Sequence, residues 1–200
     1  MRRYVEVVNE LSELEIRELG TENIDDLVNI CVSQSSLSHA ETLKEGSQRK
    51  KVWIKKALKD FGSCAKIAYV KGEPIGFVEF YPVQMFPFLR HMVKDRKIIL
   101  ITCVFVGGKK TKGQQREYQG MGIGSKLIQA LIADLKQRRI PCFDDEKADR
   151  IAIGSWCSHT GFPEVLPRFR NFFFKNGFIE DPDFPDPTEK DGILVYDLTK

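Results

Sequence analysis

The feature that most constrains this chain is a strand that runs into a glycine-rich turn and then a helix, between Lys97 and Arg139. Residues 98–106 are an almost unbroken apolar run, which predicts a buried strand. Residues 119–124 then open a segment whose apolar residues recur on one helix face: Leu127, Ile128, Leu131, Ile132 and Leu135. Such a turn leaves backbone N–H groups at the positive end of a helix dipole, so it predicts a phosphate site.

Two common phosphate-binding loops fit this turn poorly. A Walker loop needs Gly-Lys-Ser/Thr, whereas Gly124 is followed by Ser125-Lys126, which is the reverse order. A dinucleotide fingerprint would need a third glycine at position 125 and a place early in the chain. A nucleotide-binding module is therefore disfavoured.

The turn resembles the acyl-CoA-binding motif of the GNAT family of N-acetyltransferases, Arg/Gln-x-x-Gly-x-Gly/Ala, with Gln119, Gly122 and Gly124 at its fixed positions. A strand hairpin over residues 65–81 precedes it, and the aromatic helix ending at residues 172–178 follows it, in the family's order. The resemblance covers roughly residues 14–199. It implies an α/β (α+β) GNAT fold with a central mixed, mostly antiparallel sheet of six to seven strands flanked by helices.

Composition favours one domain outside the membrane. With 200 residues and 42% hydrophobic content, we expect residues 1–200 to form a single GNAT domain, and residues 1–13 leave room for an N-terminal extension. A net charge of +3 argues against nucleic acid, and no apolar run approaches the roughly 20 residues needed to span a bilayer. Five widely spaced cysteines without a Cys-x-x-Cys pair indicate free thiols in a reducing compartment, so we expect a cytoplasmic protein.

Periodicity and turn residues predict the other elements. A first strand is expected at residues 15–19, followed by a helix that Thr21 caps and that runs through Ser33. A second helix is expected over residues 47–61, with an apolar stripe formed by Val52, Trp53, Lys56, Ala57 and Leu58. After the central helix we expect a strand at residues 151–157, a helix at residues 163–176 and a closing strand at residues 192–198.

The resemblance implies that acetyl-CoA is the cosubstrate and that no metal takes part. A backbone N–H on the central strand, around Val104, Phe105 and Val106, would meet the thioester oxygen. The connection over residues 107–118 carries four basic side chains that could attract CoA, or it is a solvated loop. The diphosphate would be held by the turn itself: Gln119, Gly120, Met121, Gly122, Ile123, Gly124 and Ser125.

Acetyl transfer to an amine needs a group that takes the amine proton and a route for the leaving thiolate. The central strand carries neither Glu nor His, so Glu79 on the neighbouring strand is the candidate base, acting through water; otherwise it is an exposed sheet-edge carboxylate or a buried ion-pair partner. The family's acid is a tyrosine four residues before the helix-ending glycine, and here that residue is Phe173. Cys157 and His159 are candidate substitutes, with a Cys–His acyl-enzyme route ranked below direct transfer.

Two functions remain open at this stage. The first is an acetyl-CoA-dependent N-acetyltransferase that moves the acetyl group directly to a primary amine. The second is a GNAT-fold sensor or regulatory module that binds acyl-CoA without turnover, which Phe173 favours. A small-molecule amine is preferred over a peptide or protein amine, because Glu79 and residues 144–146 are acidic and would suit a cation if they face the groove. Dimers are frequent in the family, and the oligomeric state stays open.

Overall fold

The computed structural model describes residues 11–33, 40–86, 97–107, 118–138, 140, 147–154, 166–182 and 193–200. Its strands form a seven-stranded sheet in the order β1-β2-β3-β4-β5-β7-β6. β4 and β5 are parallel, whereas β1–β2, β5–β7 and β6–β7 are antiparallel. The expected mixed, mostly antiparallel sheet with flanking helices is confirmed.

The chain divides into two compact units. The first consists of residues 1–78 and 104–130, and the second of residues 79–103 and 131–200. Each unit is described below by itself.

In the first unit, η1 (Leu11–Glu13) precedes β1 (Leu14–Glu18), which pairs with β2 (Ala65–Val70). β2 turns into β3 (Glu73–Pro82) through Lys71 and Gly72. Their φ angles of 52° and 77° are both positive, as a two-residue hairpin turn of type I′ requires. The predicted first strand and hairpin are confirmed.

The connection from β1 to the helix α2 (Ile24–Ser33) is held by Asn23. Its Oδ1 accepts the Gly20 N–H at 2.8 Å, and its Nδ2 donates to the Glu18 carbonyl at 3.0 Å. The side chain of Asn23 thereby satisfies two backbone groups that no ladder or helix bond reaches. The helix begins later than a cap at Thr21 requires, so that assignment was wrong.

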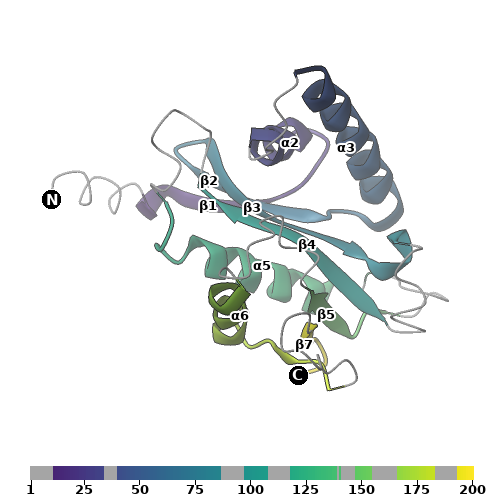
Figure 1. Ribbon diagram of the computed structural model, residues 1–200, viewed down its shortest axis with the longest axis vertical. Coiled ribbons are helices and arrows are strands. Elements are labelled where there is room, and N and C mark those ends of the chain that lie inside the picture. The colour runs from purple at the N-terminus through teal and green to yellow at the C-terminus, as the bar shows by residue number, and fades with distance from the viewer. Residues whose placement is uncertain are drawn as a thin grey trace, which may run out of the picture. The chain divides into compact units, whose positions relative to one another are not determined.

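α3 (Ala40–Phe61) is one helix of 22 residues and begins before the predicted residue 47. Its fully buried side chains include Ile54 and Ala57, whereas Val52 is 69% exposed. Residues two apart on a helix point about 200° apart, so Ile54 and Val52 lie on opposite sides. The prediction that Val52 belongs to the buried apolar stripe was therefore wrong. Figure 1 shows α2 and α3 over the same face of the strands in this unit.

β4 (Ile98–Val106) and α5 (Ile123–Gln137) contribute residues to both units. β4 matches its predicted range, and α5 begins at the end of the predicted glycine-rich turn. All five residues of the predicted α5 stripe are buried (Leu127, Ile128, Leu131, Ile132 and Leu135). Along β4, the residues up to Ile101 are buried and those from Thr102 to Val106 are half-buried. Only the second half of β4 is therefore accessible to a ligand.

The second unit contains η2 (Val83–Met85), β5 (Arg150–Ile153), α6 (Leu166–Lys175), β6 (Ile179–Glu180) and β7 (Leu194–Asp197). The last two predicted strands and the last predicted helix are thus confirmed in their described parts, and residues 155–157, 163–165 and 192 of these predictions lie outside the described residues. A core cluster joins η2, β4, β5 and β7 through Val83, Ile98, Leu100, Ala152, Ile193 and Val195.

α6 ends as the aromatic sequence predicts. The Phe178 N–H donates to the Phe173 carbonyl at 3.1 Å and the Gly177 N–H to the Phe174 carbonyl at 3.0 Å. With φ of 87° at Gly177, this is a Schellman ending, which needs a residue that tolerates positive φ. Phe173 is fully buried, and its ring contacts those of Phe172 and Phe178, each at 5.0 Å between centroids.

Gly76→Ala should destabilise the protein, because a Cβ there would lie 2.6 Å from the Phe105 carbonyl oxygen and 3.1 Å from the Val106 Cα. These are backbone atoms, so the strands must separate, at a cost of about 1–3 kcal/mol in urea denaturation. Gly46→Ala is the matched control. Gly46 is exposed on α3 with no atom within 4 Å of a Cβ, so this change should stabilise by about 0.5–1 kcal/mol. Equal effects of the two changes would contradict the close approach at Gly76.

Candidate functional site

The candidate cofactor turn comprises residues 118–125, between β4 and α5. Gly120 and Gly122 both have φ of 79°, a conformation that residues with a Cβ rarely adopt. A Cβ at either glycine would meet no atom within 4 Å, and both residues are exposed. The two glycines therefore shape the backbone and leave open space beside it, where a ligand can approach closely.

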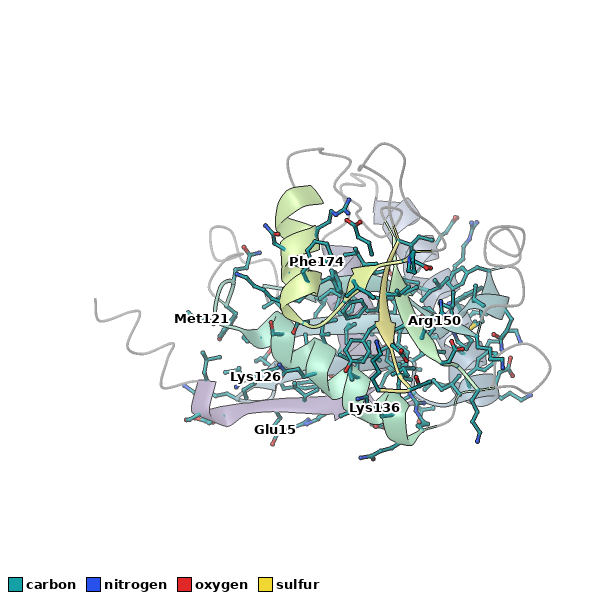
Figure 2. The ribbon with its side chains drawn as sticks, turned by 90° about the horizontal axis from the view of Figure 1, so that it is seen from below. Glu15, Met121, Lys126, Lys136, Arg150 and Phe174 are labelled. Atoms are coloured by element: carbon teal, nitrogen blue, oxygen red, sulfur yellow. The ribbon has the colours of Figure 1, made fainter. Side chains whose placement is uncertain are left out.

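The first turn of α5 directly follows these two glycines. The Gly122 carbonyl accepts the Lys126 N–H at 3.1 Å, so the N–H groups of Ile123 and Gly124 precede the first bond of the helix. Ile123 is only 1% exposed and fixes the start of the helix to the core. Figure 2 shows Met121 in the turn and Lys126 at the first turn of α5. Because the N–H groups and the helix dipole favour the same charge, this geometry suits a phosphate group.

Gln119 ties the turn to the end of β4, since its Nε2 donates to the Val106 carbonyl at 3.3 Å. On the other edge of β4, the Gly107 N–H donates to the Ile75 carbonyl of β3 at 2.9 Å. The Phe77 and Phe105 rings, 6.3 Å apart, continue this pairing two residues along each strand, so the strands are antiparallel. The end of β4 is thus fixed on both of its edges.

Three residues of β4 were predicted to meet the thioester oxygen, and this register divides them between the two edges of the strand. In an antiparallel ladder, successive residues turn their N–H and C=O groups to opposite edges. Gly107 and Phe105 therefore face β3, whereas Val104 and Val106 face the other edge, as the bond from Gln119 to the Val106 carbonyl also requires. The N–H groups of Val104 and Val106 are consequently the ones directed away from β3.

Glu79 belongs to the second unit and is only 4% exposed. The Tyr81 hydroxyl donates to Glu79 Oε1 at 2.5 Å, and the Thr102 hydroxyl of β4 donates to the Glu79 carbonyl at 3.3 Å. β3 lies inside the strand order, so the reading of Glu79 as an exposed sheet-edge carboxylate is wrong. The Tyr81 ring is itself buried and packs edge-on against Phe86, 6.0 Å away.

Several predicted site residues lie outside the described residues. They are Cys157, His159, the acidic residues 144–146 and the basic connection over residues 108–117. Cys31, Cys64 and Cys103 are described and are not in disulfides. Among the described residues, no group of three or more His, Cys, Asp or Glu side chains could hold a metal ion. None of the described helices is both long enough and apolar enough to cross a membrane.

Two contacts add to what the sequence predicted for the site. Strand alternation already places Glu79 and Tyr81 on one face, but the hydroxyl contact depends on the side-chain rotamers. Gln119 was singled out by its motif as a ligand for the cofactor, and its bond to Val106 needs the return of the chain to the end of β4. No local sequence signal carries that contact.

One comparison with known proteins identifies a family. The sequence profile of the Acetyltransferase (GNAT) family matches residues 26–154. A search of curated protein sequences found no match.

Solved structures with the same fold include three acetyltransferases. A GNAT-family acetyltransferase from Staphylococcus aureus Mu50 has 16% identity and a TM-score of 0.54, covering 92% of this chain and 99% of its own. PaiA N-acetyltransferase from Thermoplasma acidophilum, solved in complex with coenzyme A, has 15% identity and a TM-score of 0.52, with 92% and 98% covered. A spermidine N-acetyltransferase chimera from Vibrio cholerae SpeG and hSSAT has 13% identity and a TM-score of 0.54, with 94% and 96% covered.

The contact between Tyr81 and Glu79 can be measured by a double-mutant cycle in urea denaturation. Tyr81→Phe should cost about 1–3 kcal/mol, because it removes a hydrogen bond from a buried carboxylate. In a Glu79→Gln background the same change should cost less, because a neutral amide accepts a weaker bond. An identical cost in both backgrounds would show that the hydroxyl does not act on Glu79.

Proposed function

The chain belongs to the acetyltransferase (GNAT) family, and we propose that it is an acetyl-CoA-dependent N-acetyltransferase that transfers the acetyl group directly to a primary amine. The family supports acyl transfer in general. The observation that carries the proposal is the exposed turn at Gly120 and Gly122, with φ of 79° at both and open space beside them, at the start of α5. A diphosphate there would accept hydrogen bonds from the turn and from the first residues of the helix.

In this proposal, Gln119–Ser125 hold the diphosphate and the end of β4 holds the acyl group. Acetyl-CoA supplies the thioester, and the N–H of Val104 or Val106 stabilises the charge that develops on its oxygen. Gln119 contributes indirectly, because its bond to the Val106 carbonyl fixes the distance from the turn to that edge. The complex of the structurally similar PaiA with coenzyme A supports the choice of acyl-CoA.

The reaction forms a bond from the amine nitrogen to the acyl carbon and breaks the carbon–sulfur bond of the thioester. The amine must first be neutral, and Glu79 is proposed to receive its proton through water. Tyr81 would hold the Glu79 carboxylate in one orientation through their 2.5 Å hydrogen bond. Phe173 is fully buried, and its phenyl ring has no acidic proton to give. The thiolate would therefore leave into solvent or be protonated by another group.

The alternative function is acyl-CoA binding without turnover, as a sensor. It is favoured by Phe173, which occupies the family's acid position and serves as core, in ring contact with Phe172 and Phe178. Under either function the turn binds acyl-CoA, so only release of the CoA thiol in the presence of an amine separates them. A small-molecule amine remains the proposed acceptor class.

Gly122→Asp should abolish CoA binding in calorimetric titration while the protein stays folded. The change puts a side chain and a negative charge into the open space where the diphosphate would lie. Gly72→Asp is a matched control, because Gly72 also has positive φ (77°) and open space but lies in the β2–β3 turn. CoA affinity should survive in the control. Unchanged affinity in Gly122→Asp would remove the turn from the cofactor site.

Glu79→Gln should lower the rate of acetyl transfer and shift its pH dependence to alkaline values, because solvent must then deprotonate the amine. The measurement is the pH–rate profile of thiol release, with Glu73→Gln at the exposed start of the same strand as the control. A pH–rate profile of Glu79→Gln identical to that of the wild type would show that Glu79 is not the base. The proposed cofactor site would stand in that case.

A further inference from the structure

A cysteine and a lysine from two different helices meet in the first unit. The Nζ of Lys50, on α3, lies 3.0 Å from the Sγ of Cys31, on α2. Both residues are half-buried, and the thiol is not in a disulfide. The contact therefore joins a nucleophilic sulfur and a primary amine at a place that small oxidants can reach.

Two further contacts hold this pair in place. Lys50 Nζ lies 5.9 Å from the centroid of the Phe77 ring, in the range of a cation–π contact. The next residue, Lys51, forms an ion pair with Asp25 of α2 at 2.6 Å. This ion pair joins α2 and α3 at the residue next to Lys50. The Lys50 amine and the Cys31 sulfur can therefore stay close together without rearrangement of either helix.

We propose that Cys31 and Lys50 form a covalent, oxygen-bridged link, Sγ–O–Nζ, when the protein meets hydrogen peroxide. Thiols are the first protein groups to react with peroxide, and the sulfenic acid so formed condenses with nearby nucleophiles. A direct sulfur–nitrogen bond would need the two atoms to move together by more than an ångström. One oxygen atom between them fits the observed separation of 3.0 Å with little movement.

The chemistry balances with two molecules of peroxide. The first oxidises the Cys31 thiol to a sulfenic acid and leaves one water. The second oxidises the Lys50 amine, after loss of its extra proton to solvent, to a hydroxylamine and leaves a second water. The hydroxylamine oxygen then forms a bond to sulfur, the sulfenic S–OH bond breaks, and a third water leaves. Four thiol groups of an added reductant reverse the process, giving two disulfides and one water.

The link would make the helical pair α2–α3 sensitive to oxidation. It closes the chain between residues 31 and 50, so it restricts the unfolded state as a disulfide of that loop length does. It also protects Cys31 from further oxidation, since the sulfur is no longer a sulfenic acid. This modification site is independent of the acetyltransferase proposal, because it needs neither CoA nor an acceptor.

Intact-mass measurement after titration with hydrogen peroxide tests the proposal. The expected product is heavier by about 14 Da, from one oxygen gained and two hydrogens lost, and excess dithiothreitol should restore the original mass. Peptide mapping should find the peptides of Cys31 and Lys50 joined. The linked protein should melt about 6–12 °C higher than the reduced one, since a loop of this length contributes about 3 kcal/mol.

Lys50→Arg keeps the charge but has no amine to oxidise, so its Cys31 should instead gain about 32 Da as a sulfinic acid. Lys51→Arg is the matched control on α3 and should form the link as wild type does. Cys31→Ser should lose it. The proposal is overturned if Cys31 and Lys50 peptides stay separate, if the linked product has lost about 2 Da as a direct sulfur–nitrogen bond would require, or if Lys50→Arg gives the wild-type product.

Discussion

The close approach of β3 and β4 at Gly76 is the constraint on which the candidate cofactor site depends. A Cβ at this position would stand 2.6 Å from the Phe105 carbonyl oxygen, so only glycine lets the two backbones lie together there. That approach is part of the register in which the Gly107 N–H bonds to the Ile75 carbonyl. The register determines which edge of β4 each backbone N–H and C=O group faces. The Val106 carbonyl then becomes available to Gln119, which fixes the turn before α5.

Burial of the Glu79 carboxylate in the second unit sets a desolvation cost against the hydrogen bonds that the carboxylate accepts. Removing a carboxylate from water costs several kcal/mol unless hydrogen bonds replace the lost solvent. The Tyr81 hydroxyl supplies one such bond, and hydrogen bonds to charged groups contribute about 1.5–3 kcal/mol. A glutamine could fill the same space at lower electrostatic cost. A role in proton transfer would give a reason to keep a carboxylate at this buried position, and this is the premise of the proposed base.

The sequence predicted the elements with strong local signals and missed contacts that depend on distant residues. β4 was predicted with its observed bounds, because it is an almost unbroken apolar run, and the buried face of α5 was predicted from its regular stripe. The stripe of α3 was misjudged, because Val52 is apolar by type and yet exposed. The start of α2 was misplaced, because the connection before it is held by the side chain of Asn23, which directly precedes Ile24.

For the site itself, the motif predicted the turn but not the hydrogen bond from Gln119 that holds it to the end of β4. That Val104 and Val106 face the edge away from β3 follows from the register with β3, which no single strand reveals. The contact of Cys31 with Lys50 joins residues 19 apart on two helices, so it too required the packed structure.

The measurement that tests the central claim most directly is release of CoA thiol from acetyl-CoA by the purified protein, with and without a panel of small amines and peptides. Thiol release that depends on the amine, with the acetylated amine as product, is the result that the account predicts. Binding of acetyl-CoA with no release by any amine would contradict transfer and favour the sensor. Absence of binding would contradict the cofactor site and leave only the family and the fold.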